Sequence, residues 1–160
     1  MKADIEHFRL PRYREIPYIG LYLDQTVKYI NVVLSPLGCI EATPSMISNY
    51  VKKGYIDKPV KKLYSEFQIA QLLFIMTAKL VLSMDNIEIL FRKQQEMSTL
   101  QAAYDAFCES FEQTLAFTFG LREEAPQGVL GDSEEERLLQ SVITTVSNAV
   151  YINHCFELMK

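Results

Sequence analysis

Residues 43–65 read TPSMISNYVKKGYIDKPVKKLYS and carry the strongest structural signals in the chain. Thr43 is a good helix N-cap, and Pro44 occupies the first helical position, where a missing N–H costs nothing. Gly54 suits the residue after a helix C-terminus, and the two lysines before it complement the negative end of the helix dipole. The stretch predicts a short helix over 44–53, followed by a turn.

The predicted helix 44–53 has one apolar and one polar face. Ile47, Tyr50 and Val51 share one side, and the other side carries small or basic polar residues at i, i+3, i+4 and i+7: Ser45, Ser48, Asn49 and Lys52. Small side chains let a helix lie deep in a DNA major groove, where asparagine can bind adenine and serine or lysine can bond base edges. A solvated helix face has the same pattern.

The turn after this helix is strongly basic. Residues 54–64 are short and interrupted by Pro59, so we expect a small β-wing or turn there. Around the single acid Asp57, residues 44–62 hold five lysines: Lys52, Lys53, Lys58, Lys61 and Lys62. Lysines on a projecting turn can neutralise phosphates and release counterions. We therefore expect the basic wing over 57–63, together with Lys53, to contact the DNA backbone.

The net charge of −4 conceals a difference between the two halves of the chain. Residues 1–80 carry 11 Lys/Arg and 7 Asp/Glu, whereas residues 81–160 carry 5 and 13. This predicts that only the first half meets a polyanion. An irregular N-terminal arm over 1–17 adds three further candidate contacts: Arg9, Arg12 and Arg14.

Apolar spacing predicts helices along the rest of the chain. The expected ranges are about 19–34, then 65–82 after a serine cap, and a short helix from the Ser83 cap. Helical spacing from Met97 to a stop near Gly120, and a capping box at residues 133–136, predict a C-terminal helical hairpin. The expected fold class is all-α, with at most one small β-hairpin.

No pattern in the sequence indicates an enzyme or a cofactor. Cys39, Cys108 and Cys155 are odd in number and scattered, which is typical of a reducing cytoplasm. His154 beside Cys155 makes a poor chelate, and no C-x-x-C spacing supports a metal or redox site. No apolar run reaches the length of a membrane span. We expect a cytoplasmic protein with no catalytic residue, no metal, no cofactor and no membrane contact.

Aromatic residues recur near the end of the chain. The series comprises Phe107, Phe111, Phe117 and Phe119. These side chains could line an apolar ligand pocket in the C-terminal hairpin. Core packing or a dimer interface is the more usual role of such a series.

Residues 46–91 resemble the MerR-type winged helix-turn-helix domain. That family has a recognition helix ending in Gly, a short basic wing between apolar residues, a Tyr, a helix with an L-x-F-I core and a Ser-apolar-acid-x-Ile helix start. The matching positions are Ile47, Tyr50, Gly54, Ile56, Tyr64, Leu72, Phe74, Ile75, Ser83, Met84 and Ile87. The runs LPRYREIPYIGLYLDQTVKYI (10–30) and TPSMISNYVKKGYI (43–56) look still closer to uncharacterised bacterial MerR-like proteins catalogued as a domain of unknown function.

The resemblance implies a winged helix-turn-helix DNA-binding region over residues 1–92 and a hairpin for dimerisation or effector binding over 93–160. We expect a transcriptional regulator that binds double-stranded DNA as a homodimer, because one such module covers only a half-site. Any small-molecule effector is unknown. Two alternatives stay open, since the family usually has Arg where this chain has Ser48. One is a protein-interaction module on a MerR-like fold without DNA binding, and the other is a ligand-sensing or metal-sensing regulator.

Overall fold

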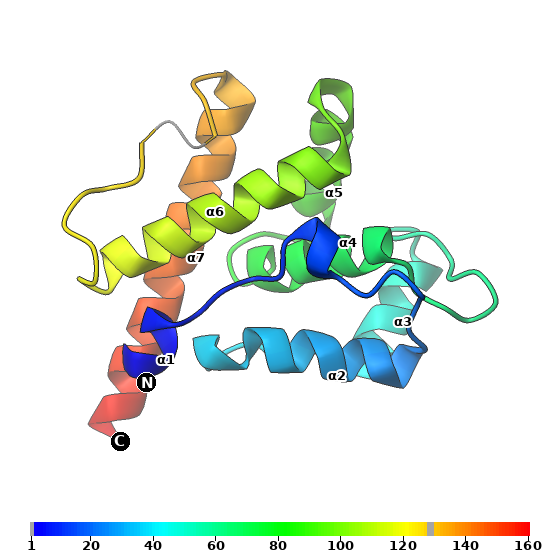
Figure 1. Ribbon diagram of the computed structural model, residues 1–160, viewed down its shortest axis with the longest axis horizontal. Helices are drawn as coiled ribbons and strands as arrows, with labels where there is room; N and C mark the ends of the chain where they lie inside the picture. Colours follow the sequence, from blue (N-terminus) through cyan, green and yellow to red (C-terminus); the bar gives the residue numbers. More distant parts are fainter. Residues whose placement is uncertain (1, 128–129) are drawn as a thin grey trace.

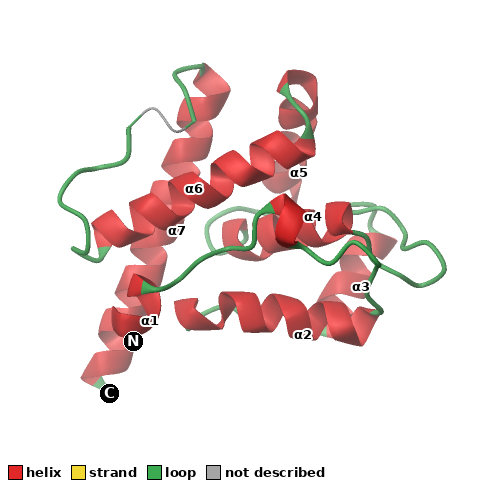
Figure 2. Ribbon diagram, in the orientation of Figure 1, coloured by secondary structure: helices red, strands yellow, loops and turns green. Residues whose placement is uncertain are grey.

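The computed structural model describes residues 2–127 and 130–160, and this part of the chain is helical without any strand (Figures 1 and 2). The all-α expectation is therefore confirmed for the described residues. Short 3-10 turns occur at Tyr13–Glu15 and Ser35–Leu37. The helices are α1 (Lys2–Glu6), α2 (Leu23–Leu34), α3 (Pro44–Lys52), α4 (Glu66–Ala78), α5 (Met84–Met97), α6 (Leu100–Thr118) and α7 (Glu134–Met159).

Helix α4 lies at the centre of the molecule. Its sequence, EFQIAQLLFIMTA, is apolar on nearly every side, and ten of its thirteen residues are buried. A helix of this kind is stable only when other elements surround it, and α4 packs against α2, α5, α6 and α7. Ser65 caps it as predicted, because the Ser65 hydroxyl accepts a hydrogen bond from the Gln68 N–H.

The predicted C-terminal pair of helices is present as α6 and α7, which cross in Figure 1. The capping box that opens α7 also forms: Ser133 Oγ accepts from the Glu136 N–H at 3.1 Å, and Glu136 accepts from the Ser133 N–H at 3.3 Å. Of the aromatic series, Phe107, Phe111 and Phe119 are buried in the core, whereas Phe117 is exposed. Packing therefore explains three of the four aromatic side chains.

The N-terminal arm is docked on α6. Leu10 and Ile16 are buried, and Tyr104 donates its hydroxyl to the Pro11 carbonyl at 2.7 Å. The expected domain boundary between residues 92 and 93 falls inside α5, and the buried side chains before and after it belong to one hydrophobic cluster. The two ends of the chain thus share a core.

Several predicted helix bounds are wrong. Helix α4 ends at Ala78 instead of about residue 82, and α5, expected to be short, has 14 residues. Two other differences have a local cause. Helix α2 begins at Leu23 instead of residue 19, because Gly20 has a left-handed backbone (φ 85°) and Leu21 pairs its backbone with Tyr64. Met97 ends α5 instead of opening the next helix. The extended backbone at Ser98 separates the two helices, and Thr99 caps α6.

Candidate nucleic-acid interface

Helix α3 is held at both ends by the residues that predict it. Thr43 Oγ1 accepts a hydrogen bond from the Met46 N–H at 3.2 Å, and Gly54 follows the helix with a φ of 80°. The loop before α3 is tied back to α2 by the amide of Asn31, which donates to the Ala42 carbonyl at 3.0 Å and accepts from the Ala42 N–H at 2.7 Å. These contacts fix where α3 starts relative to α2.

The polar face of α3 is open to solvent. Ile47 and Tyr50 are buried on the inner side, and the outer side exposes all four predicted contact residues, Ser45, Ser48, Asn49 and Lys52. Figure 1 places α3 at the opposite end of the molecule from the C-terminus of α7. The helix is therefore free to approach a large partner from its outer side.

The expected β-wing is a tight turn and not a pair of strands. The Leu63 N–H donates to the Val60 carbonyl at 2.9 Å, and Lys61 (φ 52°) and Lys62 (φ 66°) occupy the two central positions. Positive φ at both positions is the pattern of a type I′ hairpin turn. Only isolated bridges flank it, because the chain enters α4 directly after Tyr64 and too few residues remain to extend a ladder.

Three contacts hold this loop against the helices. Leu21 and Tyr64 exchange two backbone hydrogen bonds of 3.0 and 2.8 Å. The buried side chain of Gln68 donates to the Asp57 carbonyl at 2.7 Å. Tyr55 donates its hydroxyl to Asp85 Oδ1 at 3.2 Å, and desolvation together with that carboxylate raises the pKa of Tyr55, which keeps the donor protonated. The turn thus projects from an anchored base.

The five lysines of α3 and the turn have no partner within residues 2–127 and 130–160. All five side chains are exposed, and none of them is in an ion pair or a hydrogen bond there: Lys52, Lys53, Lys58, Lys61 and Lys62. Some other basic residues do have carboxylate partners, such as Lys93 with Glu96, whereas others, such as Lys28, have none among the described residues. The candidate interface is therefore a group of exposed cations next to a polar helix face.

The arginines of the arm are arranged differently. Arg12 makes a bidentate pair with Glu112, with N–O distances of 2.7 and 2.9 Å, and this pairing raises its pKa. Arg9 pairs with Glu15 at 2.7 Å, and Arg14 is exposed. Carboxylates of the chain itself thus engage both guanidinium groups, the one on Arg9 in an exposed pair, and DNA contacts by the three arginines of the arm stay a prediction.

Sequence reasoning missed a group of exposed apolar side chains near the base of the turn. Three of these residues lie on either side of Leu21, which pairs with Tyr64: Tyr18, Ile19 and Tyr22. The fourth, Val60, is the first residue of the turn. Tyr18 is 82% exposed and Ile19 is 73% exposed, so neither contributes to the core. These residues follow no helical or strand periodicity, and only the neighbouring Pro17 and Gly20 indicate that the segment is irregular.

The described residues contain no group of three or more His, Cys, Asp or Glu side chains placed to hold a metal ion. All three cysteines are free. Burial raises the pKa of the Cys108 thiol to about 12, so Cys108 is not a nucleophile at neutral pH. Within the described ranges, no helix is both long enough and apolar enough to span a membrane.

Residues 11–107 match the family model described as a domain of unknown function, DUF1836. The chain belongs to this family. Comparisons with curated proteins and with solved structures gave no significant match. The DUF1836 region runs from the arm through α5 into α6, so it contains α3 and the basic turn, whereas α7 lies beyond it. The description of this family model names no helix-turn-helix, so the match does not show a MerR-like relationship.

Proposed function

We propose that this DUF1836 protein is a DNA-binding transcriptional regulator with a MerR-like arrangement of α2, α3, the basic turn, α4 and α5. In this proposal the outer face of α3 enters the major groove, where Ser45, Ser48, Asn49 and Lys52 read base edges. The turn and Lys53 lie along the phosphate backbone. In this proposal α2 and α3 form the helix-turn-helix, and the basic turn is its shortened wing.

The observation that carries the proposal is the group of unpartnered lysines. In a chain with net charge −4, five exposed ammonium groups gather on α3 and the turn that follows it, with Asp57 as the only acid within residues 44–62. An exposed, uncompensated cation cluster attracts polyanions and gains free energy by releasing their counterions.

The backbone of the turn gives independent support. Lys61 and Lys62 have left-handed φ angles, which cost a residue with a side chain about 1 kcal/mol each relative to glycine. Asparagine and glycine are the usual residues at these two positions. Two lysines at positions that disfavour them are consistent with a role for their charge.

The proposed regulator acts as a homodimer, since one module covers a half-site. The last turns of α7 expose an apolar surface at i, i+4 and i+7 spacing, formed by Ile152, Phe156 and Met159. Such a surface is suited to pairing with the same surface of a second copy around a two-fold axis.

Selection of bound fragments from random duplex DNA tests the proposal directly. Lys61→Ala keeps the backbone requirement of the turn but removes the charge, so affinity should fall on every sequence and the slope of log K against log salt should decrease by about 0.9. Asn49→Ala should instead relax preference at one base position. Lys93→Ala on α5, where the lysine pairs with Glu96, is the control and should behave as wild type. Absence of duplex binding at low salt would refute the proposal.

A protein-interaction module is a second candidate, and the exposed apolar residues Tyr18, Ile19 and Val60 favour it. Exposed apolar side chains beside a charged turn are typical of protein contact surfaces. A photo-crosslinking amino acid placed at Tyr18, and in a separate variant at Ser48, distinguishes the two candidates in cells. Adducts removed by nuclease support DNA binding, whereas nuclease-resistant adducts removed by protease support the second candidate.

A further inference from the structure

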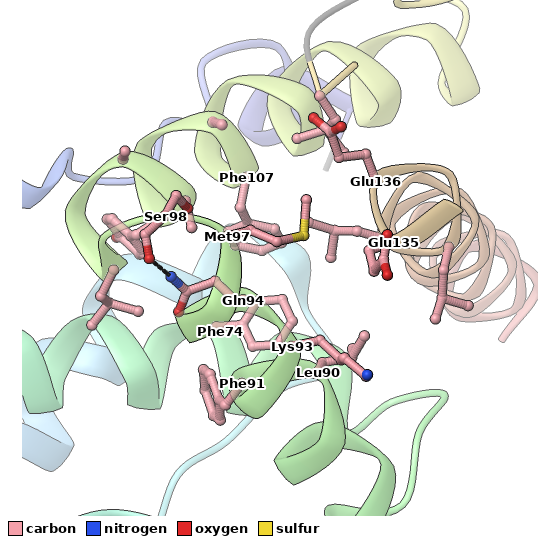
Figure 3. A pocket seen from close by; sticks show the side chains of 18 of the residues that line it. Phe74, Leu90, Phe91, Lys93, Gln94, Met97, Ser98, Phe107, Glu135 and Glu136 are labelled. Carbon is pink, nitrogen blue, oxygen red and sulfur yellow. Dashed lines mark hydrogen bonds between the residues drawn. The ribbon is translucent and has the colours of Figure 1, made fainter. Parts of the chain in front are cut away.

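A pocket of about 630 Å³ lies between α4, α5, α6 and the first turn of α7 (Figure 3). This volume is within the range of small-molecule sites. Three phenylalanines form much of its wall: the Phe74 ring centroid lies 5.0 Å from that of Phe107 and 5.5 Å from that of Phe91. Leu90, Met97 and other apolar side chains complete the wall. The pocket is therefore mainly apolar and aromatic.

One edge of the pocket is acidic. Glu134, Glu135 and Glu136 line it from the first turn of α7, and Figure 3 shows Glu135 across from Met97 of α5. Glu136 is engaged in the helix cap, but Glu134 and Glu135 are exposed and make no hydrogen bond or ion pair with any described residue. Lys93 is the only basic residue among those that line the pocket, and its ammonium lies 3.9 Å from Glu96.

We propose that this pocket binds a small organic cation with an aromatic or similarly apolar body. The apolar body would lie against Phe74, Phe91 and Phe107, and the cationic group would lie at the edge near Glu134 and Glu135. Aromatic side chains pack well against an aromatic or apolar body, and a carboxylate forms stronger hydrogen bonds with an ammonium than with a neutral group. An anion of the same shape would meet three carboxylates and only one lysine. The proposal does not depend on DNA binding, because it concerns a different surface.

Three probes with one apolar body and different charges test this proposal: 2-naphthylmethylammonium, the neutral 2-naphthylmethanol and the anionic 2-naphthylacetate. The chain has no tryptophan, so naphthalene emission can report binding to the full-length protein. We expect the cation to bind most tightly and the anion most weakly. Equal affinities for the three probes, or no binding of the cation up to its solubility limit, would overturn the proposal.

Variants locate the site. Glu135→Gln should weaken binding of the cation about fivefold, as expected for one partly exposed charge, and should leave the neutral probe unaffected. Glu124→Gln, which removes the same charge from the loop away from the pocket lining, is the matched control. Ala103→Leu fills part of the pocket and should weaken all three probes, whereas Gln101→Leu on the exposed side of α6 should not. Unchanged binding in folded Ala103→Leu protein, judged by its thermal midpoint, would place the probes elsewhere and refute the assignment.

Discussion

Lys61 and Lys62 combine an unfavourable backbone with a charge that the fold itself does not use. The type I′ geometry at these positions suits Asn-Gly far better than Lys-Lys. The double change Lys61→Asn/Lys62→Gly should therefore raise the free energy of unfolding by about 1–2 kcal/mol. The same change removes two cations from the proposed phosphate contact, so affinity for duplex DNA should fall.

Urea denaturation and fluorescence anisotropy measure the two effects separately. A gain in stability together with a loss of DNA affinity is expected only if the two lysines serve DNA binding. If the double variant is more stable and binds DNA as well as wild type does, the turn has no part in DNA recognition. The variant Lys62→Gly alone is a useful intermediate, since it removes one strained residue and one charge.

Two buried glutamines on α4 differ in their hydrogen bonds, and one of them joins α4 to the loop before it. Gln68 bonds the Asp57 carbonyl and accepts from the Ser65 N–H at 2.9 Å, whereas the buried Oε1 of Gln71 has no partner. Gln68→Met should cost about 1–2 kcal/mol, because it leaves two part-buried backbone groups without their hydrogen-bond partner. Gln71→Met should be neutral or stabilising, since it removes an unsatisfied polar atom.

Hydrogen exchange of the loop amides gives a second readout for this pair of variants. Faster exchange over residues 57–64 is expected in Gln68→Met and not in Gln71→Met. Equal stabilities and equal exchange rates in the two variants would contradict the role given to Gln68. Both changes lie on the same helix and replace the same residue type, so each controls for the other.

The elements that the sequence predicts well are those with local causes. Thr43, Ser65 and Ser133 each cap a helix through a hydrogen bond three residues away, and such short-range signals are visible without a fold. Ser45, Ser48, Asn49 and Lys52 are exposed together because one helix period decides which face they share. The family at the level of an unknown-function domain was also recognisable from the motifs of residues 10–56.

Features with distant causes were not predictable. Arg12 is bound by Glu112, one hundred residues later in the chain, and nothing in an irregular arm indicates which carboxylate it will meet. The base of the turn is fixed by two backbone hydrogen bonds between Tyr64 and Leu21, and this tertiary contact has no sequence signature. The pocket combines Phe74, Phe107 and Glu135 from three separate helices, so it exists only once the helices pack.

At the scale of the whole molecule, Glu112 connects the arm to α6. Its carboxylate accepts from the Leu10 N–H at 2.8 Å and from both terminal nitrogens of Arg12, and both side chains are largely shielded from solvent. Glu112→Gln should lower the free energy of unfolding by about 2–3 kcal/mol, because it leaves a partly buried guanidinium without its counter-charge. Chemical denaturation measures this change. The matched variant Glu15→Gln breaks the exposed pair with Arg9 and should leave the midpoint unchanged.

The C-terminal end of α7 extends past α1 and exposes apolar side chains that no described residue covers (Figure 1). Phe156 is 61% exposed and lies at the middle of the proposed pairing surface. Phe156→Glu should convert a dimer to a monomer in sedimentation equilibrium, because two carboxylates would face each other across a two-fold axis.

The monomer should bind a duplex with two half-sites roughly tenfold or more weakly, as the second module no longer adds its contacts, while affinity for a single half-site stays unchanged. Leu158→Glu introduces the same charge at an exposed position of the same helix, about 160° around the helix from Phe156, so it should remain dimeric. A monomeric wild-type protein at the concentrations that bind DNA would remove α7 from the proposed function, and α3 with its basic turn would then have to act as a single module.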